Sequence, residues 1–176
     1  MQALRNVSIF CGFVLLVLLI CPTITAYDDR AVQYYNKGTD LIESGRYTEA
    51  VASYDKAIAI NPDFADAWHN RGIALDDLGQ YTEAVASYDK AIAIKPNLTE
   101  AWYNRGIALD KLGQYTEAVA SFDKAIAIKP DYNEAVNNRA IVLKKQNQAI
   151  PLMYAPIGAI IIMVGISVWS RYRYSL

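Results

Sequence analysis

The stretch that decides the fold occurs twice: residues 65–85 read ADAWHNRGIALDDLGQYTEAV, and residues 99–119 read TEAWYNRGIALDKLGQYTEAV. The offset from Trp68 to Trp102 is 34 residues, and the two 34-residue units agree at 27 positions. A more divergent copy begins at Ala31, and half a copy begins at Asn133. A fixed period of this length is typical of stacked structural repeats. We therefore divide the sequence into three full units, 31–64, 65–98 and 99–132, and one terminal helix, 133–147.

Each unit is predicted to form a hairpin of two α-helices. In the second unit, apolar residues recur at helical spacing in two runs, which are Trp68, Gly72 and Leu75, and then Ala84, Tyr88 and Ala91. Gly79 lies between the runs, where its freedom to adopt positive φ ends the first helix. Pro96 ends the second helix, because proline lacks an amide donor and restricts the residue before it. A hairpin this small buries its apolar stripe only by stacking on its neighbours.

Residues 31 to about 147 resemble the tetratricopeptide repeat (TPR) family. In the third unit the family's signature positions are occupied by Trp102, Arg105, Gly106, Leu109, Ala118, Phe122, Ala125 and Pro130. Arg105 replaces the usual leucine, and Leu109 replaces the usual aromatic residue. The resemblance implies an all-α solenoid of three helical hairpins with a polar capping helix. Units this similar, together with the apolar ends of the chain, resemble membrane-anchored TPR proteins of prokaryotes, archaea among them.

The resemblance also implies a function, because TPR arrays are binding scaffolds. The first helix of each hairpin lines a concave groove that receives a partner peptide. By helical spacing, positions 2, 5, 6, 9, 12 and 13 of each unit share that face. The groove is therefore predicted to include Asn36, Asn70, Asn104, Asn138, Tyr35, His69, Tyr103, Ile73, Ile107, Asp66 and Glu100.

An asparagine recurs at position 6 of every unit. Its side-chain amide offers an acceptor and two donors, which suits the backbone of an extended peptide of any sequence. The neighbouring rings of Tyr35, His69 and Tyr103 supply amphipathic contact area typical of recognition surfaces. Two interpretations remain open: a row of asparagines that binds a peptide backbone, which we favour, or solvated residues that recur because the units were duplicated.

The charge of the repeat region favours a basic or neutral partner. All 18 acidic residues of the chain lie between Asp28 and Glu134, so this region carries a charge of about −4. The acids that map to the groove face include Asp66, Glu100, Glu134, Asp76, Asp77 and Asp110. Through most of the groove, acidic or neutral residues replace the lysines and arginine with which chaperone-binding TPRs hold an acidic peptide terminus. That class of partner is disfavoured.

A basic residue recurs at position 7 of every unit, as Lys37, Arg71, Arg105 and Arg139. One interpretation is an anion-binding stripe. The other is that the side chains pack between helices and pair with the carboxylates of Asp55, Asp89 and Asp123. Because the basic residue recurs inside a packing motif, we favour the second interpretation.

Both ends of the chain are apolar. Residues 1–26 have the layout of a signal peptide cleaved after Ala26, or of an uncleaved anchor. Residues 150–169 form an uncharged run long enough to cross a bilayer as a helix. Arg171 and Arg173 lie in the tail 170–176, which the positive-inside rule places in the cytoplasm. The sequence thus predicts a protein tethered to the cell membrane with extracytoplasmic repeats.

Several other functions are disfavoured by composition. The net charge of −1 gives no basic excess for binding nucleic acid. Cys11 and Cys21 both lie in the apolar leader, and His69 is the only histidine, so no cofactor, metal site or catalytic group is expected. Asn97 lies in an N-glycosylation sequon, a possible modification if the repeats are exported. The alternatives to peptide binding are self-association of a structural envelope protein and accessory binding of polysaccharide.

Overall fold

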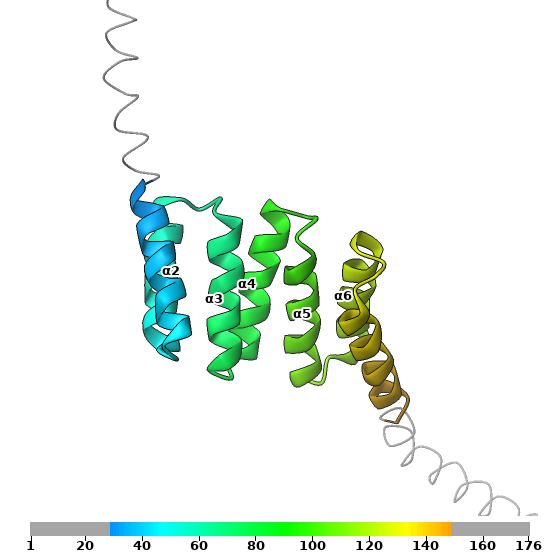
Figure 1. Ribbon diagram of the computed structural model, residues 1–176. Coiled ribbons are helices and arrows are strands. Elements are labelled where there is room, and N and C mark those ends of the chain that lie inside the picture. Colours follow the sequence, from blue (N-terminus) through cyan, green and yellow to red (C-terminus); the bar gives the residue numbers. More distant parts are fainter. Residues whose placement is uncertain (1–28, 149–176) are drawn as a thin grey trace, which may run out of the picture.

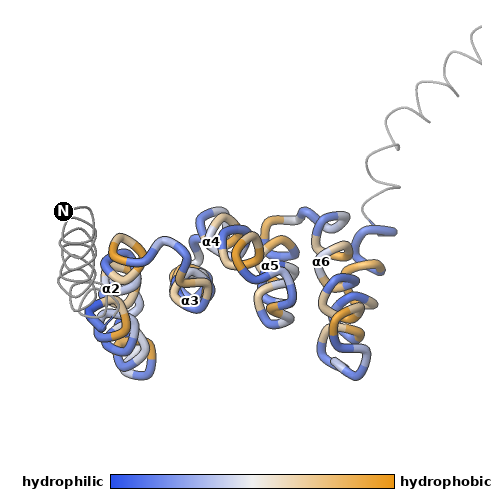
Figure 2. Tube along the Cα trace, turned by 90° about the horizontal axis from the view of Figure 1, so that it is seen from above, coloured by the Kyte–Doolittle hydropathy of each residue, from blue (hydrophilic) through white to orange (hydrophobic). Residues whose placement is uncertain are grey.

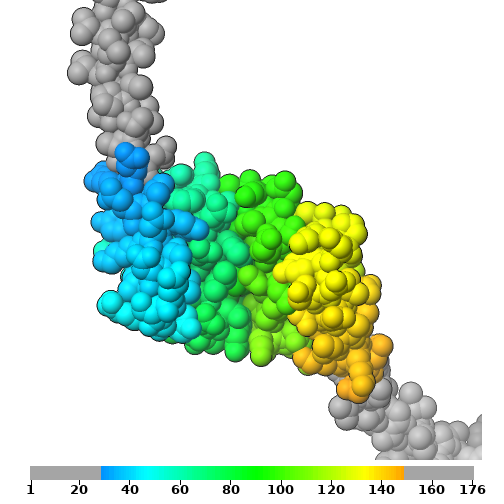
Figure 3. Space-filling model, viewed as in Figure 1, coloured from blue at the N-terminus to red at the C-terminus, as the bar shows by residue number. Residues whose placement is uncertain are grey.

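The computed structural model describes residues 29–148, which form a row of antiparallel helical hairpins (Figure 1). The helices are 29–43, α2 (Tyr47–Ile60), α3 (Ala65–Asp77), α4 (Tyr81–Ile94), α5 (Thr99–Lys111), α6 (Tyr115–Ile128) and 133–148. Three hairpins correspond to the three units of the sequence, here called repeats 1, 2 and 3. The space-filling view shows these repeats following one another in chain order as one continuous body (Figure 3).

A glycine-centred motif closes each hairpin between its two helices. In repeat 2, Gly79 adopts φ of 74°, a conformation that costs other residues steric strain. Its amide donates to the carbonyl of Asp76 at 2.9 Å, and the amide of Gln80 donates to that of Leu75 at 2.8 Å. This pair of bonds satisfies carbonyls left over at the end of α3. Gly45 and Gly113 do the same in the other repeats.

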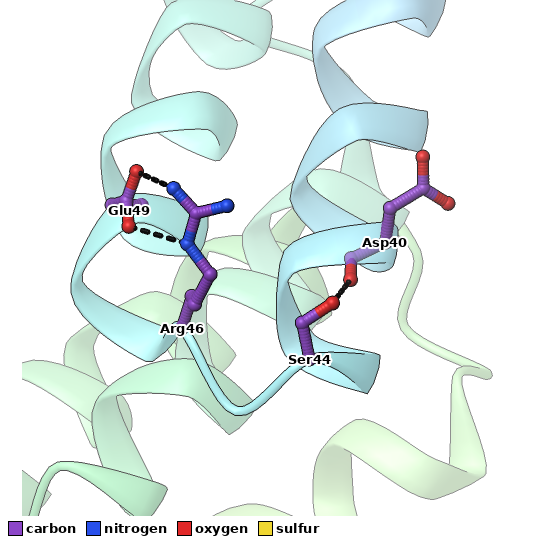
Figure 4. Close-up of polar contacts among 4 residues, drawn as sticks. All are labelled: Asp40, Ser44, Arg46 and Glu49. Carbon is purple, nitrogen blue, oxygen red and sulfur yellow. Dashed lines mark hydrogen bonds and ion pairs between the residues drawn. The ribbon is translucent and has the colours of Figure 1, made fainter.

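The turn of repeat 1 has two additional polar contacts (Figure 4). The hydroxyl of Ser44 donates to the backbone carbonyl of Asp40 at 2.9 Å. The guanidinium of Arg46 donates from Nε to the carboxylate of Glu49 at 2.6 Å. Both side chains of this ion pair are more than half exposed, so the pair adds little to stability.

The connections between repeats are held by tryptophan. Lys95, which precedes Pro96, leaves the helical conformation with φ of −130° and ψ of 83° and ends α4. The chain then enters α5, and Trp102 Nε1 donates to the carbonyl of Pro96 at 2.9 Å. Trp68 makes the same bond to Pro62 one repeat earlier. Each tryptophan therefore ties the start of a hairpin to the connection that precedes it.

The array curves with one set of helices inside. We call 29–43, α3, α5 and 133–148 the inner helices, and α2, α4 and α6 the outer helices. The inner helices α3 and α5 contact each other directly, whereas α2, α4 and α6 make no contact with one another. The inner helices therefore line the concave side.

The core of each hairpin is an aromatic ring set against a glycine. Tyr54, Tyr88 and Phe122 on the outer helices are almost fully buried. Each ring faces a glycine of the inner helix, and a Cβ built on that glycine would lie less than 3 Å from the nearest ring carbons. The remaining core is mostly alanine, and the apolar positions recur along each helix with polar positions between them (Figure 2). Small residues thus let inner and outer helices approach closely.

The structure has the helical hairpins, turns and connections that the sequence predicts, and the terminal helix continues to residue 148, the last residue described. In the described residues, no helix combines the length and hydropathy needed to cross a bilayer. The predicted leader (1–26), membrane-spanning segment (150–169) and tail (170–176) lie outside the described residues.

Candidate functional site

The asparagines of the inner helices bond to the repeat before them. Asn70 donates from Nδ2 to the hydroxyl of Tyr35 at 3.1 Å, and Asn138 donates to that of Tyr103 at 2.9 Å. Asn104 Nδ2 lies 3.1 Å from Nε2 of His69. Each bond joins position 6 of one unit to position 5 of the unit before it. We call the asparagines Asn36, Asn70, Asn104 and Asn138 the asparagine row, and Tyr35, His69 and Tyr103 the ring row.

The ring row is packed beneath the asparagine row. The Tyr35 ring lies 4.9 Å from that of Phe64 and 5.9 Å from that of Tyr54, measured between centroids. The rings of His69 and Tyr88 are 5.8 Å apart. All three rings of the row are therefore half-buried. They offer less free contact area than the sequence suggested, and their polar tips hold the asparagine amides.

The bonded asparagines keep unused hydrogen-bonding capacity. Each inter-repeat bond uses one of the two Nδ2 hydrogens, and within residues 29–148 no protein group donates to the Oδ1 of Asn104 or Asn138. Asn70, Asn104 and Asn138 are half-buried, and Asn36 is exposed. The row therefore presents amide groups whose position is fixed by a neighbouring repeat and whose hydrogen-bonding capacity is incompletely used.

His69 is the one titratable member of the ring row near neutral pH. Burial lowers the pKa of His69 from its usual value, while Glu100, Asp66 and a hydrogen bond to Asn70 act in the opposite direction. An amide nitrogen can only donate, so the contact with Asn104 requires Nε2 to be unprotonated. The imidazole is thus neutral at pH 7.

The arginines at position 7 pair with the repeat before them, as predicted. Arg71 donates from Nε to Asp55 at 2.7 Å and from Nη1 to Ser87 at 2.6 Å. Arg105 makes the equivalent bonds at 2.6 Å to Asp89 and Ser121. Arg139 pairs with Asp123. These guanidinium groups are engaged within the array, so they do not form a free anion-binding stripe.

Two equivalent carboxylates differ in their pairing. Both carboxylate oxygens of Asp110 accept hydrogen bonds from the ammonium of Lys145, at 2.8 and 2.6 Å. Asp76 occupies the same position in repeat 2, but its buried Oδ1 has no hydrogen-bond partner. Burial raises the pKa of Asp76, and the charge of Asp77 adds to the rise, while Lys111 opposes it. The inner surface therefore carries an incompletely compensated negative charge.

The other predicted groove residues are less uniform. Ile73 and Ile107 are half-buried and pack against the core. Asp66 and Glu100 are exposed, and Asp66 lies 3.9 Å from Lys95. Asn97 of the sequon is exposed in the connection between α4 and α5. In the described residues, no cluster of histidine, cysteine and carboxylate groups could hold a metal ion.

The inter-repeat bonds of the asparagine row were not predicted from the sequence. The signal was present in the sequence, since a ring at position 5 is followed by an asparagine 35 residues later in each pair of units. Ser87 and Ser121, which accept hydrogen bonds from Arg71 and Arg105, recur with a period of 34 residues. A search for polar pairs separated by one period plus one residue would have found the ring–asparagine bonds.

Solved structures with the same fold are TPR domains. The Arabidopsis OM64 TPR domain is 26% identical, with a TM-score of 0.66 over 68% of this chain and 98% of that one. The second TPR domain of human RPAP3, in complex with the HSP70 peptide SGPTIEEVD, is 25% identical, with a TM-score of 0.65 over 66% and 97%. The first TPR of Spaghetti (RPAP3), bound to the HSP90 peptide SRMEEVD, is 24% identical, with a TM-score of 0.67 over 68% and 95%.

No curated protein matches the sequence. Two family models, both described as tetratricopeptide repeat, match residues 35–98 and 99–132. Together they cover more than half of the chain and coincide with the hairpins of the structure. The chain belongs to the tetratricopeptide repeat family.

Proposed function

We propose that the concave surface binds an extended segment of a protein partner through the asparagine row. The observation that carries this proposal is the fixed row of amides on the inner helices, in which the Oδ1 acceptors of Asn104 and Asn138 are unused. Backbone N–H groups of an extended segment are the donors that such acceptors suit. The RPAP3 domains that share the fold are bound to peptides, which supports a peptide as the type of ligand.

The charge of the groove supports a basic or neutral segment. The peptides bound to the RPAP3 domains end in EEVD and are acidic. Here Asp66 and Glu100 are exposed on the inner helices, and Asp76 is only partly compensated. An acidic peptide would be repelled by these carboxylates. We therefore propose that this groove selects against the kind of peptide found in those complexes.

We further propose that the repeats act outside the cytoplasm on a membrane tether. The support is the uncharged sequence of residues 150–169, followed by Arg171 and Arg173. Sealed vesicles of known orientation, prepared from cells that express the full chain, test this topology with an added protease. The repeats should be cleaved from outside while an epitope at the C-terminus survives. If the added protease instead removes the epitope and leaves the repeats intact, the topology is the reverse of the one proposed.

Affinity capture from native membranes tests peptide binding. The full chain, solubilised in mild detergent, is compared with Asn70→Ala/Asn138→Ala and with the matched control Tyr35→Phe/Tyr103→Phe. Both variants lose the same two inter-repeat bonds, but only the first loses the amides. The asparagine variant should bind a captured partner about tenfold more weakly, as expected for two lost hydrogen bonds. The tyrosine control should bind like the wild type.

Two other outcomes would redirect the proposal. Equal weakening by both variants would show that the asparagines act only between repeats. Recovery of the bait alone would favour self-association, and recovery of glycan would favour polysaccharide binding.

A further inference from the structure

The ring row contains one residue of different chemistry. Tyr35 and Tyr103 hold Asn70 and Asn138 through a hydroxyl, whereas His69 holds Asn104 through an imidazole nitrogen. A hydroxyl both donates and accepts, so it tolerates either orientation of an amide. The Nε2 atom of histidine accepts when the ring is neutral and donates when the ring is protonated. The junction between repeats 2 and 3 therefore depends on a protonation state that its two sister junctions do not share.

We infer that His69 is a positioning residue that sets the orientation of the Asn104 amide, and thereby which polar group repeat 3 offers to a bound segment. This inference rests on the proposed peptide groove and adds a regulation to it. The two orientations correspond to the neutral and the protonated imidazole.

In the neutral state, Asn104 Nδ2 donates to His69 Nε2 across 3.1 Å. The Oδ1 atom then remains available, and repeat 3 offers an acceptor to a peptide N–H. Protonation places a hydrogen on Nε2, so two donors would face each other. A half-turn of the amide about its Cβ–Cγ bond removes this conflict, because Oδ1 then accepts from the imidazolium. Repeat 3 now offers donors, which suit a peptide carbonyl.

The surroundings of His69 place this change in mildly acidic conditions. The ring packs on Tyr88 of α4 and contacts Asn104 of α5. Burial has the largest influence on the pKa of His69 and lowers it, while the carboxylates of Glu100 on α5 and Asp66 on α3 oppose the shift. The neutral orientation therefore prevails at pH 7, and the reversal occurs below the ordinary histidine value of about 6.5.

The sign of the effect on stability follows from the same contact. A histidine with a lowered native pKa binds protons more readily when unfolded. The stabilising contribution of the neutral contact is therefore present above pH 6.5 and is lost as the pH falls through the native pKa. His69→Tyr supplies the sister residue, so it should keep the junction and remove this pH dependence.

Nuclear magnetic resonance of the full chain, ¹⁵N-labelled and in detergent micelles, tests the inference without any partner. Side-chain amide signals of the asparagine row and the imidazole nitrogens of His69 are followed from pH 7.5 to 4.5. The Asn104 amide signals should shift along one titration curve with the midpoint of His69. Those of Asn138, which bonds Tyr103 and makes no contact with His69, should follow neither that curve nor that midpoint. In His69→Tyr the Asn104 shift should disappear.

Two results would overturn the inference: Asn104 signals that stay constant while His69 titrates, or an Asn104 titration that persists in His69→Tyr. Thermal unfolding of both proteins supplies a second readout, since the wild type should lose more of its melting temperature between pH 7.5 and 5 than the variant does. Because neither measurement contains a ligand, their failure is distinguishable from a failure of peptide capture.

Discussion

Among single residues, the inner-helix glycines are required because the ring of the facing outer helix leaves no room for a side chain. A Cβ built on Gly72 would lie 2.5 Å from Cε1 of Tyr88. The Tyr88 ring is almost completely buried, so it has little room to move away. Glycine within a helix costs stability relative to alanine by roughly 1 kcal/mol, and here that cost is offset by close packing of the ring.

Gly72→Ala should therefore destabilise the array, although alanine is the better helix former. We expect the free energy of unfolding to fall by about 1–3 kcal/mol, the usual cost of overpacking a core. Chemical denaturation followed by circular dichroism measures the change. As a control, Ala140→Gly changes the same repeat position in the last helix, where the side chain is exposed. It should show only the helix-propensity loss of roughly 1 kcal/mol. An unchanged or increased stability of Gly72→Ala would contradict the packing argument.

Asp76→Asn should stabilise the protein at pH 7. The buried Oδ1 of Asp76 has no partner, and an amide removes the charge that must be desolvated there. We expect the free energy of unfolding to rise by about 1 kcal/mol. The native pKa of Asp76 is raised, chiefly by burial, so protonation relieves the wild type as the pH falls. The advantage of the variant should therefore shrink on acidification.

Denaturation curves at pH 7 and pH 4.5 check this prediction. Asp77→Asn is the matched control, because Asp77 is the exposed neighbour on the same helix. If the two variants have the same stability at both pH values, the unpaired oxygen of Asp76 carries no energetic cost.

At the level of helices, one arginine joins three elements. Arg105 lies on α5 and donates to Asp89 on α4 and to Ser121 on α6. Its side chain is 21% exposed and Ser121 is buried, so water screens the bond to Ser121 less than it screens a surface pair. Repeat stacking thus has a polar component in addition to its apolar core.

Arg105→Lys should weaken the stacking of repeat 3 on repeat 2. An ammonium cannot reproduce the two separate directions of the guanidinium, so we expect the free energy of unfolding to fall by about 1 kcal/mol. Arg46→Lys is the control, because the pair of Arg46 with Glu49 is exposed (Figure 4), and its melting temperature should match the wild type. Equal melting temperatures for all three proteins would show that the two bonds of Arg105 add nothing.

The sequence predicted these helices better than it predicted the contacts between them. Gly79 and Pro96 mark helix ends through local backbone chemistry, which a sequence carries directly. The pairing of Arg71 with Asp55 was also predictable, because charge complementarity restricts the choice of partner. The contact of Asn104 with His69 depends on how closely neighbouring inner helices pack, a property that no single repeat determines. Asp76 and Asp110 illustrate the same limit, since equivalent residues differ in whether a lysine reaches them.

For the whole molecule, stability is built from contacts between adjacent repeats. Among helices α2 to α6, contacts connect each hairpin only to the next one. Such an array behaves as a one-dimensional chain of coupled units. The polar bonds follow the same rule, because position 6 bonds position 5 of the preceding unit.

Deletion of residues 65–98 should give a folded, shorter array. The cut removes one whole period, so repeat 3 stacks on repeat 1, with Asn104 facing Tyr35 and Arg105 facing Asp55. Thermal unfolding followed by circular dichroism should remain cooperative at a lower melting temperature, because one interface is lost. Deletion of residues 65–94 is the out-of-register control and should lose cooperative unfolding. A cooperative transition of equal midpoint in both deletions would contradict the register argument.

The interchangeable junctions have a genetic consequence. Repeats 2 and 3 present the same arginine, asparagine and aspartate to their neighbours, so either can follow either. Recombination between the segments that encode repeats 2 and 3 therefore joins surfaces that already fit, and a gain or loss of one period needs no compensating mutation. A lineage that carries this gene can change the length of the concave surface in steps of one asparagine, while the residues that terminate the array stay as they are.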